Sequence, residues 1–215
     1  MIQNPELKFE IKRKAVHAGI TGTFAPLIVL GITDTPLARA LGMGLYSLFL
    51  TLFVLLELSL RTGSNWRIPF ASRAYKIMAN PYELENQTML GGVFICLSGL
   101  LAVSFLNLHA ALVGIMVLSY ADSAASIFGK AFPNHSISYN SRKHWEGTLA
   151  FAAMSFAVTF FVLSFVPVTL PKQLAISLIV ALVTALAESL PVTYYYDNFT
   201  VPLSAALLTQ ILIIA

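Results

Sequence analysis

Residues 110–130 read AALVGIMVLSYADSAASIFGK, an apolar run with an aspartate inside it. A helix needs about 20 predominantly apolar residues to cross the hydrocarbon core of a bilayer. Asp122 lies six residues before Phe128, so it would lie about 9 Å inside the end of such a helix. A carboxylate at that depth costs roughly 3 kcal/mol on insertion and usually faces a functional cavity. The stretch therefore predicts a transmembrane helix that carries a polar site.

The residues around Asp122 support a packed helix with one polar face. Small side chains recur every four positions and permit close helix packing, at Ala121, Ala125 and Gly129. Asp122 shares a helical face with Ser126 and with Lys130. This face could line a polar pocket, although a structural carboxylate that hydrogen-bonds between helices would give the same pattern.

The composition of the whole chain agrees with a membrane protein. Of its 215 residues, 57% are hydrophobic and 11% are charged, and its mean hydropathy is +0.77. Ordinary soluble domains carry about 25% charged residues. The single cysteine, Cys96, lies in an apolar block, so we expect neither a disulfide nor a thiolate metal cluster. A net charge of +3 gives no reason to expect a nucleic-acid partner.

The apolar blocks predict an all-α, polytopic bundle of about seven spans in a single domain, residues 1–215. We place the spans at 15–32, 36–60, 89–108, 110–128, 149–166, 174–192 and 199–215. The first residues lack the apolar core and cleavage site of a secretory signal, so the first block is expected to remain as a helix. The boundary at residues 107–109 is the weakest, and a single bent re-entrant element is the alternative there.

Lysine and arginine set the predicted orientation, because short cytoplasmic loops are enriched in them. With a cytoplasmic amino terminus, that side holds eleven such residues: Lys8, Lys12, Arg13, Lys14, Arg61, Arg67, Arg73, Lys76, Lys130, Arg142 and Lys143. The other side holds Arg39 and Lys172. Without a targeting presequence, this pattern suits a prokaryotic plasma membrane and a site facing the cytoplasm.

Two predicted cytoplasmic loops are long, at residues 61–88 and 129–148. The first combines Trp66, Phe70 and Tyr75 with several cations. That mixture is typical of a segment lying among lipid headgroups. A simple basic loop anchored by Trp66 explains it equally well.

Further ionisable residues gather at the predicted cytoplasmic ends of other spans. They are Arg13, Lys14 and His17 at the first span, Lys143 and Glu146 (i, i+3) before the fifth, Glu188 in the sixth and Asp197 at the seventh. All except Glu188 have an ordinary explanation: cationic anchoring at Arg13 and Lys14, an interhelical hydrogen bond at His17, an interfacial segment at Lys143 and Glu146, or, for Asp197, a helix cap. Glu188, about a turn inside its span, is harder to explain in this way. Glu57 is explained by an i, i+4 ion pair with Arg61.

Taken together, the clusters indicate a site for a metal–nucleotide complex. Carboxylates hold Mg²⁺, cations bind phosphate, and an acceptor group orients a hydroxyl. Neither a G-x-x-x-x-G-K-[ST] loop nor G-x-G-x-x-G is present, and Phe128-Gly-Lys130 is followed by alanine. The four histidines are too scattered to predict a metal site.

At these clusters the sequence resembles the membrane family of dolichol kinases, phytol kinases and CTP-dependent diacylglycerol kinases. The matching pieces, in order, are Arg13-Lys-Ala-Val-His17, Asp122-Ser-Ala-Ala-Ser-Ile-Phe-Gly129-Lys130, Lys143-His-Trp-Glu146-Gly147-Thr148, Glu188 and Asp197-Asn-Phe-Thr-Val-Pro202. Glu83–Gly92 is a looser match. His144 stands where the family often has a small polar residue, which leaves the nucleotide preference open.

The resemblance implies phosphoryl transfer from CTP to the hydroxyl of a membrane lipid alcohol. It implies Asp122 and Asp197 as Mg²⁺–nucleotide ligands, with Glu146 or Glu188 in support. The nucleotide and its phosphates would be bound by Arg13, Lys14, His17, Gly129, Lys130, Lys143, Gly147 and Asn198. Asp122 is also the first candidate for the group that accepts the proton of the lipid hydroxyl. This role competes with tight metal binding by the same carboxylate.

The substrate and the reaction class are less closely defined than the site. The protein chain is short and close to the core shared by the family that it resembles. This favours a prenyl alcohol such as phytol or a dolichol-type polyprenol, with diacylglycerol as the alternative acceptor. A CTP-using phosphatidate cytidylyltransferase is the nearest rival enzyme, since it also carries intramembrane carboxylates. An ion-coupled transporter is a rival of another class, but the acidic groups lie toward one face and no inverted repeat is apparent.

Overall fold

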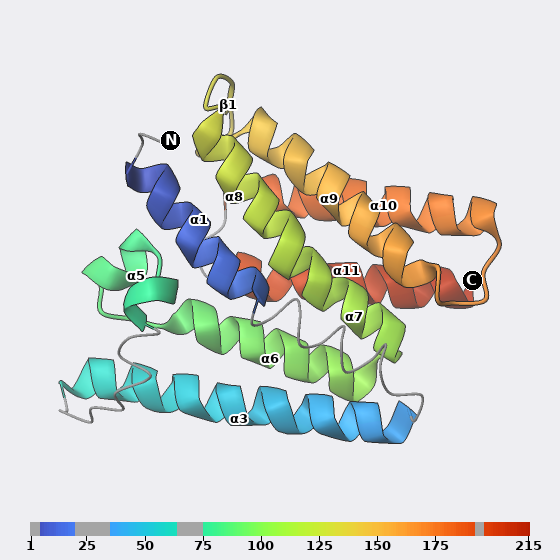
Figure 1. Ribbon diagram of the computed structural model, residues 1–215, viewed down its shortest axis with the longest axis horizontal. Coiled ribbons are helices and arrows are strands. Elements are labelled where there is room, and N and C mark those ends of the chain that lie inside the picture. The colour runs from blue at the N-terminus through green and yellow to red at the C-terminus, as the bar shows by residue number, and fades with distance from the viewer. Residues whose placement is uncertain (1–4, 20–34, 64–74, 192–195) are drawn as a thin grey trace.

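The computed structural model describes residues 5–19, 35–63, 75–191 and 196–215. Its helices are α1 (Pro5–His17), α3 (Thr35–Thr62), α5 (Pro81–Glu85), α6 (Leu90–Phe105), α7 (Leu108–Met116), the π-helix η2 (Val117–Ala121), α8 (Asp122–Ala131), α9 (Trp145–Leu163), α10 (Leu170–Ser189) and α11 (Asp197–Ile214). A short antiparallel hairpin, β1 (Ser136–Ile137) and β2 (Asn140–His144), lies between α8 and α9. The fold is an all-α bundle of the membrane type (Figure 1).

Within the described residues, five helical segments are long and apolar enough to cross a membrane. They are Pro36–Thr62, Leu108–Ala131, Trp145–Leu163, Leu170–Ser189 and Asp197–Ile214. Each coincides with one of the predicted spans to within about four residues. The predicted span 89–108 is the shorter apolar helix α6. Most of the predicted span 15–32 lies outside the described residues, so seven crossings and the cytoplasmic amino terminus remain predictions.

The doubtful boundary at residues 107–109 separates two helices. α6 ends at Phe105, and α7 begins at Leu108 and runs back in the opposite sense (Figure 1). The Asn107 side chain accepts a hydrogen bond of 2.8 Å from the backbone N–H of His109, which satisfies one of the first donors of α7. The boundary therefore separates two helices, and the choice between two crossings and a re-entrant element stays a prediction.

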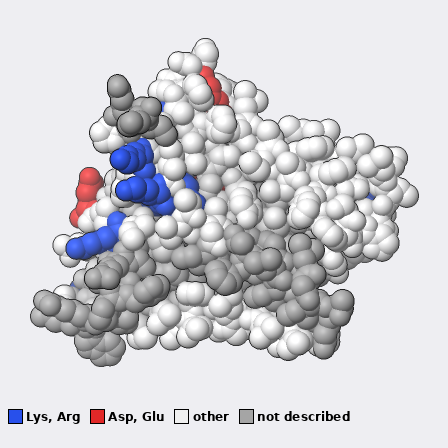
Figure 2. Space-filling view, in the orientation of Figure 1, with Lys and Arg blue, Asp and Glu red and all other residues white. Residues whose placement is uncertain are grey.

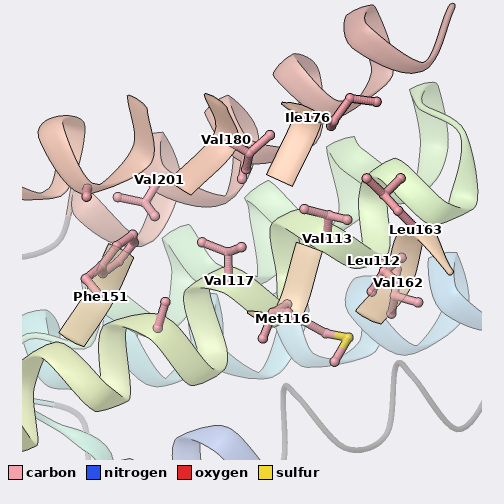
Figure 3. Close-up of a cluster of buried hydrophobic side chains, with 14 of the residues drawn as sticks. Leu112, Val113, Met116, Val117, Phe151, Val162, Leu163, Ile176, Val180 and Val201 are labelled. Carbon is pink, nitrogen blue, oxygen red and sulfur yellow. The ribbon is translucent and has the colours of Figure 1, made fainter. Parts of the chain in front are cut away.

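The main apolar core is formed by α7, η2 and α8 with the three long helices α9, α10 and α11. Val117, Phe151, Val180 and Val201 come from four different segments and are each at most 1% exposed (Figure 3). Gly114 of α7 lies against the carbonyl of Pro202, so a side chain there would collide with α11. The helical segment Leu108–Ala131, which carries Asp122, is thus the central one. In its most apolar stretch, 72% of the residues are buried.

A π-helical turn directly precedes Asp122. Residues Val117–Ala121 form η2, and the helix continues as α8 from Asp122. The hydroxyl of Ser119 donates to the Ile115 carbonyl at 2.8 Å, and that of Ser123 to the Ser119 carbonyl at 2.5 Å. A π turn holds one more residue than an α turn and so rotates the next turns of the helix; such turns are frequent at functional sites. It therefore helps to set the direction in which Asp122 points.

The predicted loop at residues 129–148 is more ordered than expected. It contains the end of α8, the hairpin and the first turn of α9. Lys143 lies in β2 and α9 begins at Trp145, so the expected i, i+3 helical pairing of Lys143 with Glu146 is wrong. The aromatic loop around Trp66 and Phe70, with the cations Arg67 and Arg73, lies outside the described residues.

Candidate active site

A cavity of about 620 Å³ lies at the end of the bundle where α1 and the hairpin meet the long helices. Its walls come from α1, α5, α6, α8, β2, α9, α10 and α11. Figure 2 shows lysine and arginine side chains gathered on the same end of the molecule. The site is therefore assembled from residues that are distant in sequence.

Asp122 of α8 faces the amino-terminal helix inside this cavity. Its Oδ2 accepts a hydrogen bond from Lys14, which is 5% exposed. The contact joins α1 to α8 across 108 residues of sequence. Because Lys14 neutralises it, a carboxylate can be kept ionised at this depth.

Glu10 holds two further cations of the cavity. Its Oε1 lies 2.5 Å from Nη2 of Arg13, and its Oε2 lies 2.8 Å from Nζ of Lys130 on α8. Glu10 itself is 1% exposed. Burial alone would raise the pKa of Glu10, but the charges of Arg13, Lys14 and Lys130 outweigh burial and hold that pKa below its ordinary 4.5. Glu10 is therefore an anion, and it docks α1 on α8.

Lys143 binds two carboxylates from different helices. Its Nζ lies 2.9 Å from Glu188 Oε1 and 2.9 Å from Asp197 Oδ2, and it also donates to the backbone carbonyl of Glu188. An ammonium has three N–H donors, so these three acceptors use all of them. Burial would lower the pKa of Lys143, but the two carboxylates raise it above its ordinary 10.5. Lys143 thus holds Glu188 and Asp197 side by side.

Each of these carboxylates keeps one oxygen for another partner. Glu188 Oε2 and Asp197 Oδ1 are buried, and neither has a hydrogen-bond partner among the described residues. A buried carboxylate oxygen without a partner costs free energy, so a cation or a hydrogen-bond donor at this point would stabilise the pair. A divalent cation fits this donor set, because Mg²⁺ prefers oxygen ligands and is usually held by one or two carboxylates plus substrate phosphates. Among the described residues, no three His, Cys, Asp or Glu side chains gather closely enough to hold a metal ion by themselves.

The hairpin is fixed against the end of α10, which explains how β2 positions Lys143. Asn140 Nδ2 donates to the carbonyls of Ser189 and Leu190 at 3.0 and 3.2 Å. The hydroxyls of Tyr139 and Ser189 lie 2.7 Å apart. The last carbonyls of a helix have no partner within the helix, and β2 supplies those partners.

A buried glutamate on α5 forms the opposite wall. Glu83 accepts the backbone N–H groups of Gly91 at 2.7 Å and of Asn80 at 3.0 Å, the latter within a capping box. Asn198 donates to the Gly91 carbonyl at 3.4 Å. A Cβ on Gly91 would lie 2.8 Å from Glu83 Oε1 and 2.9 Å from Asn198 Nδ2. Gly91 therefore has no room for a side chain. Burial raises the pKa of Glu83 above its ordinary 4.5 despite those two backbone donors.

Two glycines allow α8 and α9 to touch beside the cavity. A Cβ on Gly147 would lie 2.8 Å from the Ala125 carbonyl and 3.3 Å from the Gly129 Cα, whereas a Cβ on Gly129 would meet nothing closer than 3.6 Å. The small-residue ridge around Asp122 is thus confirmed as a packing surface.

The predicted Glu57–Arg61 ion pair is also confirmed, at 2.6 Å. Glu57 accepts the backbone N–H of Met89 as well, at 2.6 Å, which links α3 to the start of α6.

Most of the predicted site residues line this cavity. They are Arg13, Lys14, His17, Asp122, Gly129, Lys130, Lys143, Gly147, Glu188, Asp197 and Asn198. Glu146 is absent from the lining, and its Oε1 lies 2.7 Å from Nδ1 of the exposed His135. The geometry gives Glu146 no place beside the other carboxylates, because α9 starts only one residue before it and turns its side chain toward the hairpin.

Sequence reasoning missed Glu10, the residue on which two of the cations converge. A signal was present, because Glu10, Arg13, Lys14 and His17 follow one another at i, i+3, i+4 and i+7 and so share one face of α1. The run of charges around it was assigned to cationic anchoring. Glu83 was included only as a loose match ahead of a glycine-containing span.

One of the comparisons with known proteins found a relative. The chain is 36% identical over 131 residues to a phytol kinase of Synechocystis sp., and the aligned part is 59% of this chain and 56% of that enzyme. The chain thus matches little more than half the length of this relative. No family model matches the chain, and no solved structure matches it with significance.

Proposed function

We propose that this protein is a membrane kinase that transfers the terminal phosphate of a nucleoside triphosphate to the hydroxyl of a lipid alcohol. The observation that carries the proposal is a cavity at one end of an apolar bundle that unites cations for phosphate with two buried carboxylates. Each of these carboxylates has one oxygen without a hydrogen-bond partner among the described residues. The similarity to a phytol kinase over part of the chain supports it. CTP as donor and a prenyl alcohol as acceptor are the specific form of the proposal.

The roles follow from the contacts of each side chain. Arg13, Lys14 and Lys130 bind the phosphates, because they border the cavity from two helices and carry charge-assisted donors. Lys143 is a positioning residue, since its three donors are engaged by Glu188 and Asp197. Asn198 and the backbone at Gly91 form the wall opposite.

Glu188 Oε2 and Asp197 Oδ1 are the groups that would hold a divalent cation. Such a cation would neutralise charge on the phosphates during transfer. With the cation held by Glu188 and Asp197, Asp122 is free to accept the proton of the lipid hydroxyl. This removes the conflict between its two predicted roles. Asp122 is suited to that role because Lys14 keeps it ionised and its side chain retains 20% exposure.

In the proposed reaction, the lipid hydroxyl oxygen attacks the γ-phosphorus of the nucleotide. A new O–P bond forms, and the bond from the γ-phosphorus to its bridging oxygen breaks. The hydroxyl proton passes to the Asp122 carboxylate, and the nucleoside diphosphate leaves with the electron pair of the broken bond. Positioning and electrostatic stabilisation supply most of the catalysis in such transfers. The site lies at one end of the bundle, where a headgroup and a soluble nucleotide can meet.

The test is a transfer assay with purified protein in lipid. CTP labelled at the γ-phosphate is supplied with phytol, a polyprenol or diacylglycerol, and ATP and UTP replace CTP in parallel. We expect labelled lipid phosphate, with a prenyl alcohol and CTP as the best pair. Failure of every alcohol and nucleotide to give labelled lipid would refute the kinase function.

A further inference from the structure

Glu10 is a buried carboxylate to which the proposed reaction gives no role. In that reaction Asp122 accepts the proton, and Glu188 and Asp197 hold the divalent cation. Glu10 contacts Arg13 and Lys130, two of the cations that the same proposal gives to phosphate. A buried anion that binds the cations of an anion site must affect how tightly the substrate anion is held.

The geometry makes this competition direct. The two carboxylate oxygens of Glu10 are divided between the two cations, at 2.5 Å from Arg13 Nη2 and 2.8 Å from Lys130 Nζ. The side chains of Arg13 and Lys130 are 18% and 42% exposed, whereas that of Glu10 is 1% exposed. Glu10 is therefore more deeply buried than the two cations, and all three side chains border the cavity.

Two opposing effects on phosphate binding follow from this arrangement. Glu10 orders two long side chains, which favours binding by reducing the entropy lost. It also places a full negative charge within a few ångströms of any bound phosphate, in a partly dry site where charges are weakly screened. Charge repulsion at this range is larger than the ordering of two side chains, so the net effect of Glu10 is to weaken binding.

We propose that Glu10 is a built-in counter-anion that sets the affinity of the phosphate site. In the absence of ligand it pairs with both Arg13 and Lys130, offsets one of their two positive charges, and docks α1 on α8. With ligand bound it reduces the hold on phosphate, so that the nucleoside diphosphate product can leave. This deepens the proposed function and rests on phosphate binding in the same cavity.

The experiment measures binding of inorganic pyrophosphate to the full-length protein by calorimetry, without nucleotide or lipid alcohol. Glu10→Gln removes the charge and keeps the size of the side chain. We expect it to bind pyrophosphate about tenfold more tightly than the wild type, or about 1.4 kcal/mol. The KM for the nucleotide should fall by a similar factor, while kcat does not rise.

Two variants complete the design. Glu85→Gln makes the same change at an exposed residue of α5 outside the cavity, and its pyrophosphate affinity should equal that of the wild type. Glu10→Asp keeps the charge but withdraws it by one methylene, and we expect an increase of about threefold. It carries the test alone if Glu10→Gln fails to fold, which the melting temperature will show.

The outcomes separate this inference from the proposed function. Unchanged or weaker pyrophosphate binding in both Glu10 variants would overturn it, as would an absence of pyrophosphate binding in the wild type and variants alike. Tighter binding in a protein that makes no lipid phosphate would sustain the anion site and refute the kinase. Lipid phosphorylation without tighter pyrophosphate binding in the Glu10 variants would support the kinase function and refute the proposed role of Glu10.

Discussion

The two ends of the bundle use their polar side chains differently. At the end away from the cavity, Arg39 donates to the carbonyls of Val103, Ser104 and Leu106, and Lys172 donates to the carbonyl of Ile213. At the cavity end, Lys14, Lys130 and Lys143 pair with carboxylates from other elements. The first end satisfies helix termini, as any bundle must. The second joins elements through charged groups that also line a cavity.

The difference separates structural charge from functional charge in one molecule. At the end away from the cavity, these side chains supply partners to backbone carbonyls that a helix cannot satisfy itself. At the cavity end, carboxylates and cations hold one another, yet oxygens of Glu188 and Asp197 stay buried without a partner among the described residues. Substitutions at the cavity end should therefore change catalysis and ligand binding in addition to any loss of stability, whereas substitutions at the other end should change stability alone.

The largest effect is expected at Asp122. Asp122→Asn keeps the shape of the side chain but removes the charge and the proton acceptor, so lipid phosphorylation should fall by about 1,000-fold. The assay is label transfer under single-turnover conditions, with Glu85→Gln as the matched carboxylate-to-amide control. Full activity in Asp122→Asn would place the site elsewhere, even if the protein is a kinase.

Loss of Lys143 should affect both stability and the cation site. Lys143→Met leaves Glu188 and Asp197 facing each other without their shared cation, and we expect a loss of about 3 kcal/mol in unfolding free energy. Thermal unfolding measures the loss, and titration with Mn²⁺ should show tighter binding, because the repelling charge of Lys143 is gone and the carboxylate oxygens that it held are free.

The pH dependence of that loss follows from the pKa of Lys143. Because folding raises this pKa above 10.5, the contribution is fully present below pH 10.5 and is lost as pH rises through the higher, folded-state value. The stability difference between wild type and Lys143→Met should thus stay constant from about pH 7 to about pH 10. A difference that disappeared within this range would contradict the ion-pair assignment.

Close packing beside the cavity gives a matched pair of substitutions. Gly147→Ala puts a Cβ 2.8 Å from the Ala125 carbonyl, so α8 and α9 must separate, at a cost of about 2 kcal/mol. Gly129→Ala meets only ordinary contacts and should change the melting temperature little. Equal destabilisation by the two substitutions would show that the helices do not approach as closely as the Gly147 contacts indicate.

The smallest effect is expected at the other end of the bundle. Arg39→Met removes donors to the last carbonyls of α6, and we expect a loss of about 1.5 kcal/mol in stability. Pyrophosphate affinity and the KM for nucleotide should match the wild type. A change in pyrophosphate affinity as large as that of a cavity substitution would remove the distinction between the two ends.

Much of this architecture could be predicted from the sequence, because apolar length is a strong local signal. Five described helices match predicted spans, and Asp122 was identified by its cost inside an apolar run. The convergence of Arg13, Lys130, Glu188 and Asp197 on one side followed from the span order. Element ends were less certain, since apolar pattern alone does not show where a cap or hairpin starts.

The contacts within the site could not be predicted, because they depend on tertiary geometry. Lys143 was expected on a helix beside Glu146, but a strand turns it toward α10 and α11. Glu10 belongs to a run of charges that reads as solvated, and only the packing of α8 on α1 buries it. The π turn before Asp122 has no comparable signature in the apolar pattern.

The most direct test of the central claim follows both ends of the nucleotide in one experiment. Purified wild-type protein receives CTP labelled either at the α- or at the γ-phosphate, together with a prenyl alcohol and phosphatidate. We expect γ-label in a lipid monophosphate and α-label only in soluble nucleotide, as CDP and unreacted CTP. Incorporation of α-label into lipid, with the γ-label released as pyrophosphate, would contradict it and identify a cytidylyltransferase.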